Sequence, residues 1–504
     1  MFRKNTLSTA MVAAGLLSAS LLAGPQLANA QAVPTITSAG TGTLALVPYY
    51  TVRDGWDTLL NITNTSSSSL AVKVRLHESY NSRDILDFVV LLSPFDVWTA
   101  SLTNVGGVPY VRTTDRSCTV PVSVRDTGAA ASAIAYTGQF DDAGPDSTDR
   151  MLEGYVTVAV MGEAPGAPVA GSTPWLAEHV RGEPRDCAAA SNNFVRGAGI
   201  PAWASGNITG TAGSGDPTAR AVNHYGAIAN PAPLKVNVSL VKRSQGIAGG
   251  ATAVHLNGWG VGQNLVTAQQ FPWFLEPTIA SSNGLWSTSG LAAVEAAFNA
   301  AAVVNEWSNN PRLGVQTDWV VAFPTKKHHA DRNAYIQAAC NPWRSAAGGG
   351  AFAGGADCGA AVPVAPFETA FNPLNGGTSN ITVTYNLYNR EEIPIVITTD
   401  GTTISPAPPP QIRIDTLPYE TNVLVIGNSS YGPLTSALNS AVTQIVDIKD
   451  QFAGSQPEFG WVRLAFTRNP LPAAGMIFKA RNFGDPTLNF GQIMDHGYIR
   501  PVAP

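Results

Sequence analysis

Acidic residues that could bind a cation are densest between residues 141 and 149. Asp141, Asp142, Asp146 and Asp149 lie there among Gly, Ser and Pro. Loops rich in carboxylate oxygens bind calcium, which extracellular proteins use to stiffen long loops. The spacing does not match an EF-hand loop, so the alternative is a solvated acidic loop whose side chains cap turns. Calcium is the one cofactor that the sequence suggests.

Carboxylates elsewhere could perform a different chemistry, the hydrolysis of glycosidic bonds. Such enzymes need two carboxyl groups about 5–10 Å apart, which can come from distant parts of the chain. The acids available for such a pair are Asp84, Asp87, Glu306 and Asp318. The alternative for Asp84 and Asp87 is structural, because Arg83 lies beside them and could organise a buried ion-pair node with them and Asp96.

Other catalytic motifs are missing from the sequence. It contains no Gly-x-Ser-x-Gly pentapeptide, and His77-Glu78 is not followed by the second His of a zinc protease motif. His328 and His329, with Asp331 close by, form the densest metal-capable group of histidines. We interpret them as the polar end of a hairpin, because adjacent histidines rarely bind one ion. The sequence therefore predicts no catalytic residue.

Tryptophans in segments rich in Gly, Pro, Ser and Asn are candidates for contact with a partner. Aromatic rings on loops can stack on sugars or anchor a protein interface. The alternative is that each ring pins its own loop to the core. The main contact candidates are Trp175, Trp203, Trp259 and Trp286, and Trp273 and Trp343 lie in similar surroundings.

Four cysteines predict two disulfide bonds, as expected for an oxidising compartment. We favour the pairs Cys118–Cys187 and Cys340–Cys358, because each pair then brackets one weakly patterned insertion. Closing the ends of such a stretch limits the entropy that it loses on folding. A zinc site is disfavoured, since no Cys-x-x-Cys occurs.

Short β-strands explain most of the patterned sequence. The clearest is the segment from Leu70 to His77, where apolar residues alternate with Lys73, Arg75 and His77. Trp56 and Trp98 are candidates for the buried side of the central strands. Further strands are expected at residues 43–50, 56–64, 85–92, 97–102, 153–161, 234–242, 317–323, 380–388, 411–414, 421–426, 460–467 and 475–480.

One strong helix is predicted, from Gly290 to Ser308, with an Ala-rich face that favours burial. A helical turn is also possible between Leu434 and Ile448. The expected fold is mainly β, with antiparallel immunoglobulin-like sandwiches, long loop insertions such as residues 162–233, and this one buried helix.

The N-terminus has the three parts of a secretory signal peptide. Arg3 and Lys4 precede an apolar run at residues 11–22, and Ala28-Asn29-Ala30 supplies small residues for cleavage. The sequence therefore predicts an exported protein of the periplasm, the cell surface or the extracellular medium. No later segment is long and apolar enough to span a bilayer as a helix.

We expect the chain to divide into three parts. These are a signal peptide (1–30), an N-terminal β-sandwich with a disulfide-bracketed loop (31–245) and a helix-containing β-rich region (246–504), unless the last two form one intertwined domain. Charged residues make up only 13% of the chain and the net charge is −5. This composition argues against a nucleic acid partner.

Three blocks of sequence carry a resemblance that spans most of the chain. They are residues 45–65, residues 79–99 and residues 317–327, which include the motifs Leu-Val-Pro-Tyr-Tyr and Leu-Ser-Pro-Phe-Asp. In these blocks the chain resembles a functionally uncharacterised group of exported proteobacterial envelope proteins. The resemblance implies export and a β-rich fold, and it carries over no catalytic residue.

Together these features favour a non-enzymatic protein of the cell surface or envelope. It would act through protein or glycan contacts, in adhesion, in a matrix or in self-assembly, because a surface with few charges costs little to desolvate. The alternative is a secreted hydrolase that uses one of the carboxylate pairs, with glycans as its candidate substrates.

Overall fold

The computed structural model of the chain describes residues 34–138, 142, 144–196, 225–266, 279–280, 287–288, 290–330, 365–367, 369–370, 376–390, 413–449 and 458–501. The proposed signal peptide lies outside this set. The described residues all belong to one compact unit. The fold is mainly β, with several antiparallel sheets and few helices, as the sequence predicts.

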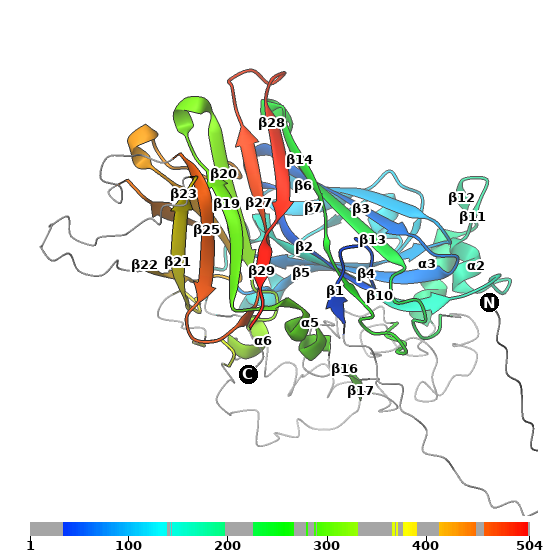
Figure 1. The fold of residues 1–504 in the computed structure, drawn as a ribbon. Coiled ribbons are helices and arrows are strands. Elements are labelled where there is room, and N and C mark those ends of the chain that lie inside the picture. Colours follow the sequence, from blue (N-terminus) through cyan, green and yellow to red (C-terminus); the bar gives the residue numbers. More distant parts are fainter. Residues whose placement is uncertain are drawn as a thin grey trace, which may run out of the picture. The chain divides into compact units, whose positions relative to one another are not determined.

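The first half of the chain supplies two large sheets (Figure 1). One has the strand order β1-β15-β2-β10-β4-β5-β8 and the other has the order β14-β13-β3-β6-β7-β9. The strands of the first sheet are β1 (Thr35–Ile36), β2 (Leu44–Thr51), β4 (Ser69–Glu78), β5 (Asp84–Leu92), β8 (Cys118–Val120), β10 (Glu153–Ala164) and β15 (Val254–Asn257). Those of the second are β3 (Trp56–Asn64), β6 (Val97–Val105), β7 (Val108–Arg112), β9 (Ala129–Ala130), β13 (Leu234–Lys242) and β14 (Ile247–Thr252).

Apolar side chains from both sheets share one core, as in a β-sandwich. Trp56 and Trp98 are both buried in it, as predicted. The immunoglobulin-like subtype stays a prediction, since these sheets have seven and six strands and an immunoglobulin domain has fewer in each.

Strand β4 differs from the expected pattern of one buried and one solvated face. Lys73, Arg75 and His77 on its polar face are each about 1% exposed. Residues that follow β20 lie over this face, since the Tyr155 hydroxyl on the neighbouring strand β10 donates to the Pro324 carbonyl. Charged side chains of the N-terminal sheet are therefore interior groups.

The C-terminal half supplies two further sheets, with the orders β22-β21-β25-β19-β29 and β24-β23-β20-β27-β28. All their pairs are antiparallel except β23 with β24. The first sheet contains β19 (Ala302–Ser308), β21 (Ile381–Asn389), β22 (Arg413–Leu417), β25 (Phe459–Phe466) and β29 (Gly497–Ile499). The second contains β20 (Val315–Ala322), β23 (Thr421–Gly427), β24 (Thr443–Asp447), β27 (Ala474–Arg481) and β28 (Phe490–Asp495).

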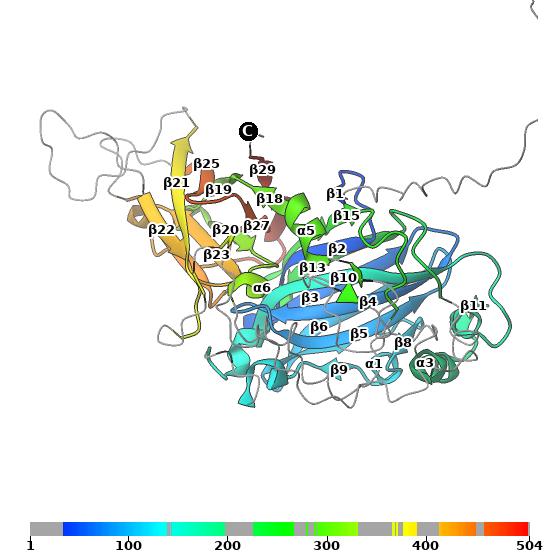
Figure 2. The ribbon, with the colours of Figure 1, turned by 90° about the horizontal axis from the view of Figure 1, so that it is seen from below.

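The described part of the chain also contains short two-stranded sheets, α-helices and several 3₁₀ turns. Three two-stranded sheets pair β11 (His179–Val180) with β12 (Glu183–Pro184), β16 (Ile279–Ala280) with β17 (Ser287–Thr288), and β18 (Asn299–Ala300) with β26 (Leu471–Pro472). The helices are α1 (Ser123–Asp126), α2 (Thr173–Ala177), α3 (Cys187–Arg196), α5 (Gly290–Phe298) and α6 (Lys327–Ala330). Figure 2 shows α5 near β1, with which it is in contact. No helix in these described segments is long and apolar enough to cross a membrane.

The predicted helix from Gly290 to Ser308 is wrong in its second half. Helix α5 ends at Phe298, and residues 302–308 form β19, which pairs with β25 and β29. The adjacent β-branched residues Val303 and Val304 favour this strand over a helix. The helical turn expected within residues 434–448 is also missing, and residues 443–447 form β24.

The expected division near residue 245 does not follow the sheets. Strands β14 and β15 lie after that point and join the two N-terminal sheets. β14 also contacts the C-terminal strand β28. Glycine permits this approach, because a Cβ on Gly491 would lie 2.9 Å from the Ala248 carbonyl oxygen.

Candidate functional site

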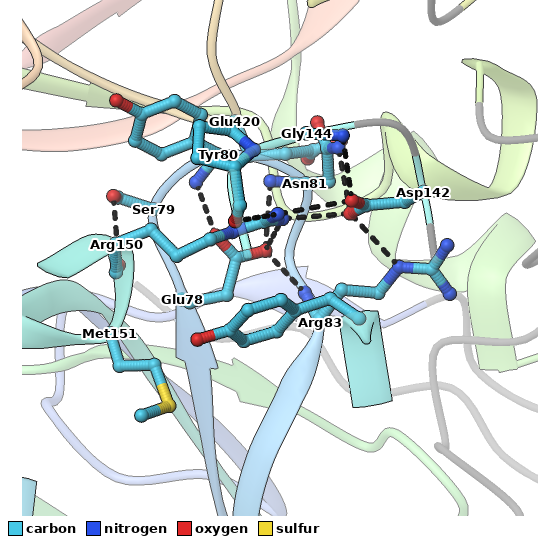
Figure 3. Close-up of polar contacts among 12 residues, drawn as sticks. Glu78, Ser79, Tyr80, Asn81, Arg83, Asp142, Gly144, Arg150, Met151 and Glu420 are labelled. Atoms are coloured by element: carbon cyan, nitrogen blue, oxygen red, sulfur yellow. Dashed lines mark hydrogen bonds and ion pairs between the residues drawn. The ribbon is translucent and has the colours of Figure 1, made fainter. Parts of the chain in front are cut away.

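A concentrated group of charged side chains is buried where the N-terminal sheets meet the C-terminal sheets (Figure 3). It surrounds the turn between β4 and β5, and residues 142–150, 324–327 and 418–421 complete it. Two backbone hydrogen bonds join its halves, from Glu420 to the Tyr80 carbonyl and from Thr421 to the Ser79 carbonyl, each 2.9 Å long. We call it the buried charge cluster; its members are Glu78, Ser82, Arg83, Asp142, Arg150, Lys326, Lys327 and Glu420.

The turn from β4 to β5 closes around the carboxylate of Glu78. Backbone N–H groups of Tyr80, Asn81 and Arg83 donate to it at 2.7, 2.9 and 2.9 Å. The guanidinium of Arg150 adds two bonds of 2.8 and 2.9 Å. This bidentate pairing holds the carboxylate in one orientation and so fixes the turn.

Arg150 also binds Asp142, so that it bridges two carboxylates. The two bonds to Asp142 are 3.0 and 2.7 Å long, and the Asn81 amide donates a third at 2.8 Å. Burial alone would raise the pKa of Asp142, but the hydrogen bonds and charge of Arg150 lower it to about 2. The ring of Tyr136 packs against the guanidinium, 4.2 Å from its carbon to the ring centre.

Lys326 fastens the C-terminal side of the buried charge cluster to the backbone. Its ammonium donates to the carbonyls of Ser379, Pro418 and Tyr419 at 2.9, 3.2 and 3.0 Å. Burial lowers the pKa of Lys326 to about 8. An amine held by three carbonyls has no donor left for a substrate, so its role is structural.

Ser82, Lys327 and Glu420 connect the two sides directly. The Ser82 hydroxyl donates to Glu420 at 3.0 Å, and the Lys327 ammonium donates to the Ser82 carbonyl at 2.9 Å. Burial raises the pKa of Glu420 to about 8 and lowers that of Lys327 to about 7. Contacts between residues more than 200 positions apart thus hold the two halves together.

Of the first pair considered for hydrolysis, Asp84 is buried and Asp87 is half-buried, both beside basic groups on β4. Asp84 pairs with Arg75 at 2.7 Å, and Asp87 pairs with Lys73. Burial raises the pKa of Asp84 to about 7. Burial also acts to raise the pKa of Asp87, but the charges of Lys73 and Arg75 and the hydrogen bond from Lys73 together outweigh it, so the pKa of Asp87 is lowered. Asp84 and Asp87 thus form ion pairs, but the predicted node around Arg83 is wrong. Arg83 lies 3.4 Å from Asp142, and Asp96 pairs with His179 at 3.3 Å.

The other two hydrolase candidates lie elsewhere. Asp318 is fully buried and accepts hydrogen bonds from Ser436, Ala437 and Leu438. Glu306 lies on β19 and pairs with Lys479 near the surface. The structure thus brings neither acid to the pair on β5.

The calcium prediction does not fit the described acids. Asp142 is committed to Arg150, and Asp149 forms two bonds of 2.8 Å with Arg53. Asp146 is exposed, and Asp141 lies outside the described residues. Where side chains are described, no three His, Cys, Asp or Glu residues come together as metal ligands.

The histidines after β20 both lie in the short helix α6. His328 is buried in α6, and His329 pairs with Glu295 of α5. Their predicted neighbour Asp331 lies outside the described residues. The hairpin predicted for them is therefore wrong, because residues 327–330 form a helix.

The tryptophans divide into core and surface residues. The prediction that Trp259 contacts a partner is wrong, because the residue is 1% exposed and its ring N–H donates to the Gly290 carbonyl. Trp175 is half-buried beneath the Arg185 guanidinium. Of the other predicted loop tryptophans, Trp203, Trp273, Trp286 and Trp343 lie outside the described residues.

Sequence reasoning missed Trp461, which is 41% exposed on β25. Its ring stacks on Tyr388 of β21, with 4.2 Å between ring centres. The alternation of the strand could have revealed it, because Val462 and Leu464 face inward and Trp461 and Arg463 therefore face outward.

The disulfide prediction is confirmed for Cys118 and Cys187, which are bonded with their Cα atoms 4.9 Å apart. The bond ties β8 to α3. Cys340 and Cys358 lie outside the described residues, so their bond stays a prediction.

An apolar surface that the sequence did not predict is formed by the loop between β27 and β28 and the first residue of β28. Phe483, Leu488 and Phe490 are 56%, 61% and 51% exposed, and the two Phe rings lie 6.5 Å apart. We call this surface the apolar tip. Asp485 and Asn489 brace it: Asp485 accepts four hydrogen bonds from within the loop, and Asn489 accepts one from the Phe483 N–H at 2.7 Å.

The apolar tip is also fastened to the N-terminal sheets. The Asn489 amide donates to the Gln245 carbonyl at 2.7 Å. Gly246 lies against Pro486, and a Cβ there would be 2.0 Å from the Pro486 carbonyl oxygen. Gly246 also has a φ of +64°, so two requirements select glycine at this position. The loop thus presents its three apolar side chains on a backbone that is held in place.

Comparison with known proteins adds no relative. No family model matches the chain, and no curated protein or solved structure is significantly similar to it.

Proposed function

We propose that the chain is an exported, non-enzymatic protein of the cell surface or envelope that works through contacts. The apolar tip carries this proposal. Three large apolar side chains, each more than half exposed within eight residues, are unusual on a protein surface that has no partner.

The way the tip is held supports a contact role. Its hydrogen bonds fix the loop before binding, so that little conformational entropy remains to be lost in a complex. Aromatic residues on a rigid support are the usual centre of a protein interface. The tip is therefore suited to protein contacts, including contacts between copies of this chain.

The signal-like N-terminus and the resemblance to exported envelope proteins support the location. The hydrolase alternative has less support, because the acids considered for it are partly or fully buried beside basic groups or lie apart.

The test combines cell fractionation with sedimentation of the purified mature protein. We expect the wild-type chain to lack residues 1–30, to remain with the envelope and to self-associate as its concentration rises. The variant F483S/L488S/F490S should be released and monomeric. A matched control is I134S/V169S/I445S, which removes three exposed but scattered apolar side chains and should behave as the wild type.

Two results would overturn the proposal. One is a wild-type protein that stays monomeric and free of the envelope. The other is glycan hydrolysis by the wild type that D84N/D87N abolishes.

A further inference from the structure

The outer face of the sheet β14-β13-β3-β6-β7-β9 is hollowed into an open depression of about 600 Å³. Its floor consists of side chains that point away from the core on three adjacent strands. Register places Asn61 beside Thr99, Leu59 beside Ser101, and Ser101 beside Arg112. The depression is thus a regular array of polar groups with one apolar side chain.

The polar side chains of this floor are available to a ligand. In the part of the chain that the structure describes, the side chains of Asn61, Thr99 and Ser101 make no hydrogen bond to the protein. Asn61 and Thr99 are exposed and Ser101 is half-buried. Amide and hydroxyl groups both donate and accept, so together they suit a ligand that carries many hydroxyl groups.

Two guanidinium groups stand at the depression on different elements. Arg112 ends β7 and lies over the Tyr110 ring at 5.1 Å. Arg125 belongs to α1, and its guanidinium is oriented by bonds of 3.0 Å to the Arg116 carbonyl and 2.9 Å to Asp126. A planar guanidinium matches a carboxylate in two parallel hydrogen bonds.

The wall that carries Arg125 closes tightly on β7. Tyr110 donates to the Thr127 carbonyl at 2.8 Å, and Gly128 follows with a φ of +87°. A Cβ on Gly128 would lie 2.4 Å from the Tyr110 ring and 2.5 Å from the Val111 carbonyl oxygen. Glycine therefore allows the wall to approach, and the depression owes its shape to that contact.

From this arrangement we propose that the depression binds an acidic oligosaccharide, a chain of sugars that carry carboxylates. The neutral floor would bind sugar hydroxyls, Leu59 would contact an apolar ring face, and the two arginines would bind carboxylates. Charge supports an anion, because the lining carries two arginines and one aspartate on a chain of net charge −5. This assignment rests on the proposed function, because the acidic oligosaccharide would be one of the contacts through which the protein works.

Calorimetric titration of the mature protein with a homogeneous oligogalacturonate of about six sugars tests this assignment. We expect binding, weakened about 10- to 100-fold by R112Q, as for a lost charge-assisted hydrogen bond. N61A/T99A should weaken binding as well, and R243Q should not, because Arg243 is a highly exposed arginine outside the depression. Maltohexaose, a neutral chain of similar length, should bind at least about tenfold more weakly than the uronate.

Three results would overturn the assignment. They are no binding of the uronate, equal binding of polyglutamate, and binding that R112Q and N61A/T99A leave unchanged. The outcome is separable from that of the proposed function. If the uronate does not bind but the apolar tip still mediates envelope association, only the assignment of the glycan site is refuted. A protein that is monomeric, unattached and hydrolytic would remove the proposed function whether or not it binds the uronate.

Discussion

The buried charge cluster and the apolar tip reverse the usual distribution of side chains. In the cluster, Glu78 and Arg150 are buried to 1% exposure or less. At the tip, Phe483 and Leu488 are more than half exposed. Burying charge and exposing apolar surface both cost free energy, so each needs a compensation that the structure should show.

The two regions are compensated in different ways. In the buried charge cluster, Glu78 and Asp142 each receive several hydrogen bonds, five in the case of Glu78. Such pairing offsets desolvation and permits one arrangement of the strands it joins. At the tip the backbone is braced and the side chains remain free. Polar chemistry in this chain thus holds sheets together, and apolar surface is left for contact.

Removal of Arg150 should produce the largest effect. R150M leaves Glu78 buried without its arginine and leaves Asp142 with Arg83 alone. We expect it to lower the free energy of unfolding by about 3–5 kcal/mol. Urea denaturation measures this. The control R243M, at an exposed arginine, should change stability by less than about 0.5 kcal/mol. Equal effects of R150M and R243M would show that the cluster is not an organising feature.

Loss of the disulfide should come next. C118S/C187S opens a covalent loop that spans 69 residues in sequence. We expect a loss of about 2–4 kcal/mol, chiefly because the unfolded chain gains freedom. Urea denaturation of the variant and the wild type under non-reducing conditions measures this loss. The control is the same comparison in reducing buffer, which opens the Cys118–Cys187 bond of the wild type, so that the two proteins should then be equally stable. A variant as stable as the oxidised wild type would contradict the expected role of the bond.

The pH dependence of stability should reveal Glu420. Its pKa is about 8 in the folded state, against an ordinary value of 4.5. Between pH 4.5 and pH 8 the folded state therefore keeps a proton on Glu420 that the unfolded state has lost. The free energy of unfolding should therefore fall as pH rises from about 4.5 to 8, by at most about 1.4 kcal/mol per pH unit from this group. E420Q should remove that slope, and E306Q, at an exposed glutamate, should keep it. Parallel pH profiles of wild type and E420Q would argue against a buried, protonated Glu420.

Local sequence patterns predicted the strands well, because alternation and turn residues report the environment of each segment. They failed where distant segments decide the environment. Lys73 and Arg75 have the pattern of a solvated face, yet residues that follow β20 cover that face. The apolar tip was missed for the same reason, since nothing local shows that Phe483 and Phe490 stay uncovered. The helix boundary at Phe298 depended on strand partners, β25 and β29, that no local window contains.

The apolar tip should give the smallest change in stability. Phe483, Leu488 and Phe490 are already mostly solvated, so F483S/L488S/F490S removes little buried area and should shift the free energy of unfolding by less than about 0.5 kcal/mol per site. N489A in the same loop should cost more, about 1–3 kcal/mol, because it removes the bonds to Phe483 and Gln245. Urea denaturation of both variants compares the stability contributed by the apolar side chains with that contributed by the hydrogen bonds of Asn489 that hold the loop. A large loss of stability in the triple variant would mean that these apolar groups belong to the core, and the contrast with the buried charge cluster would then disappear.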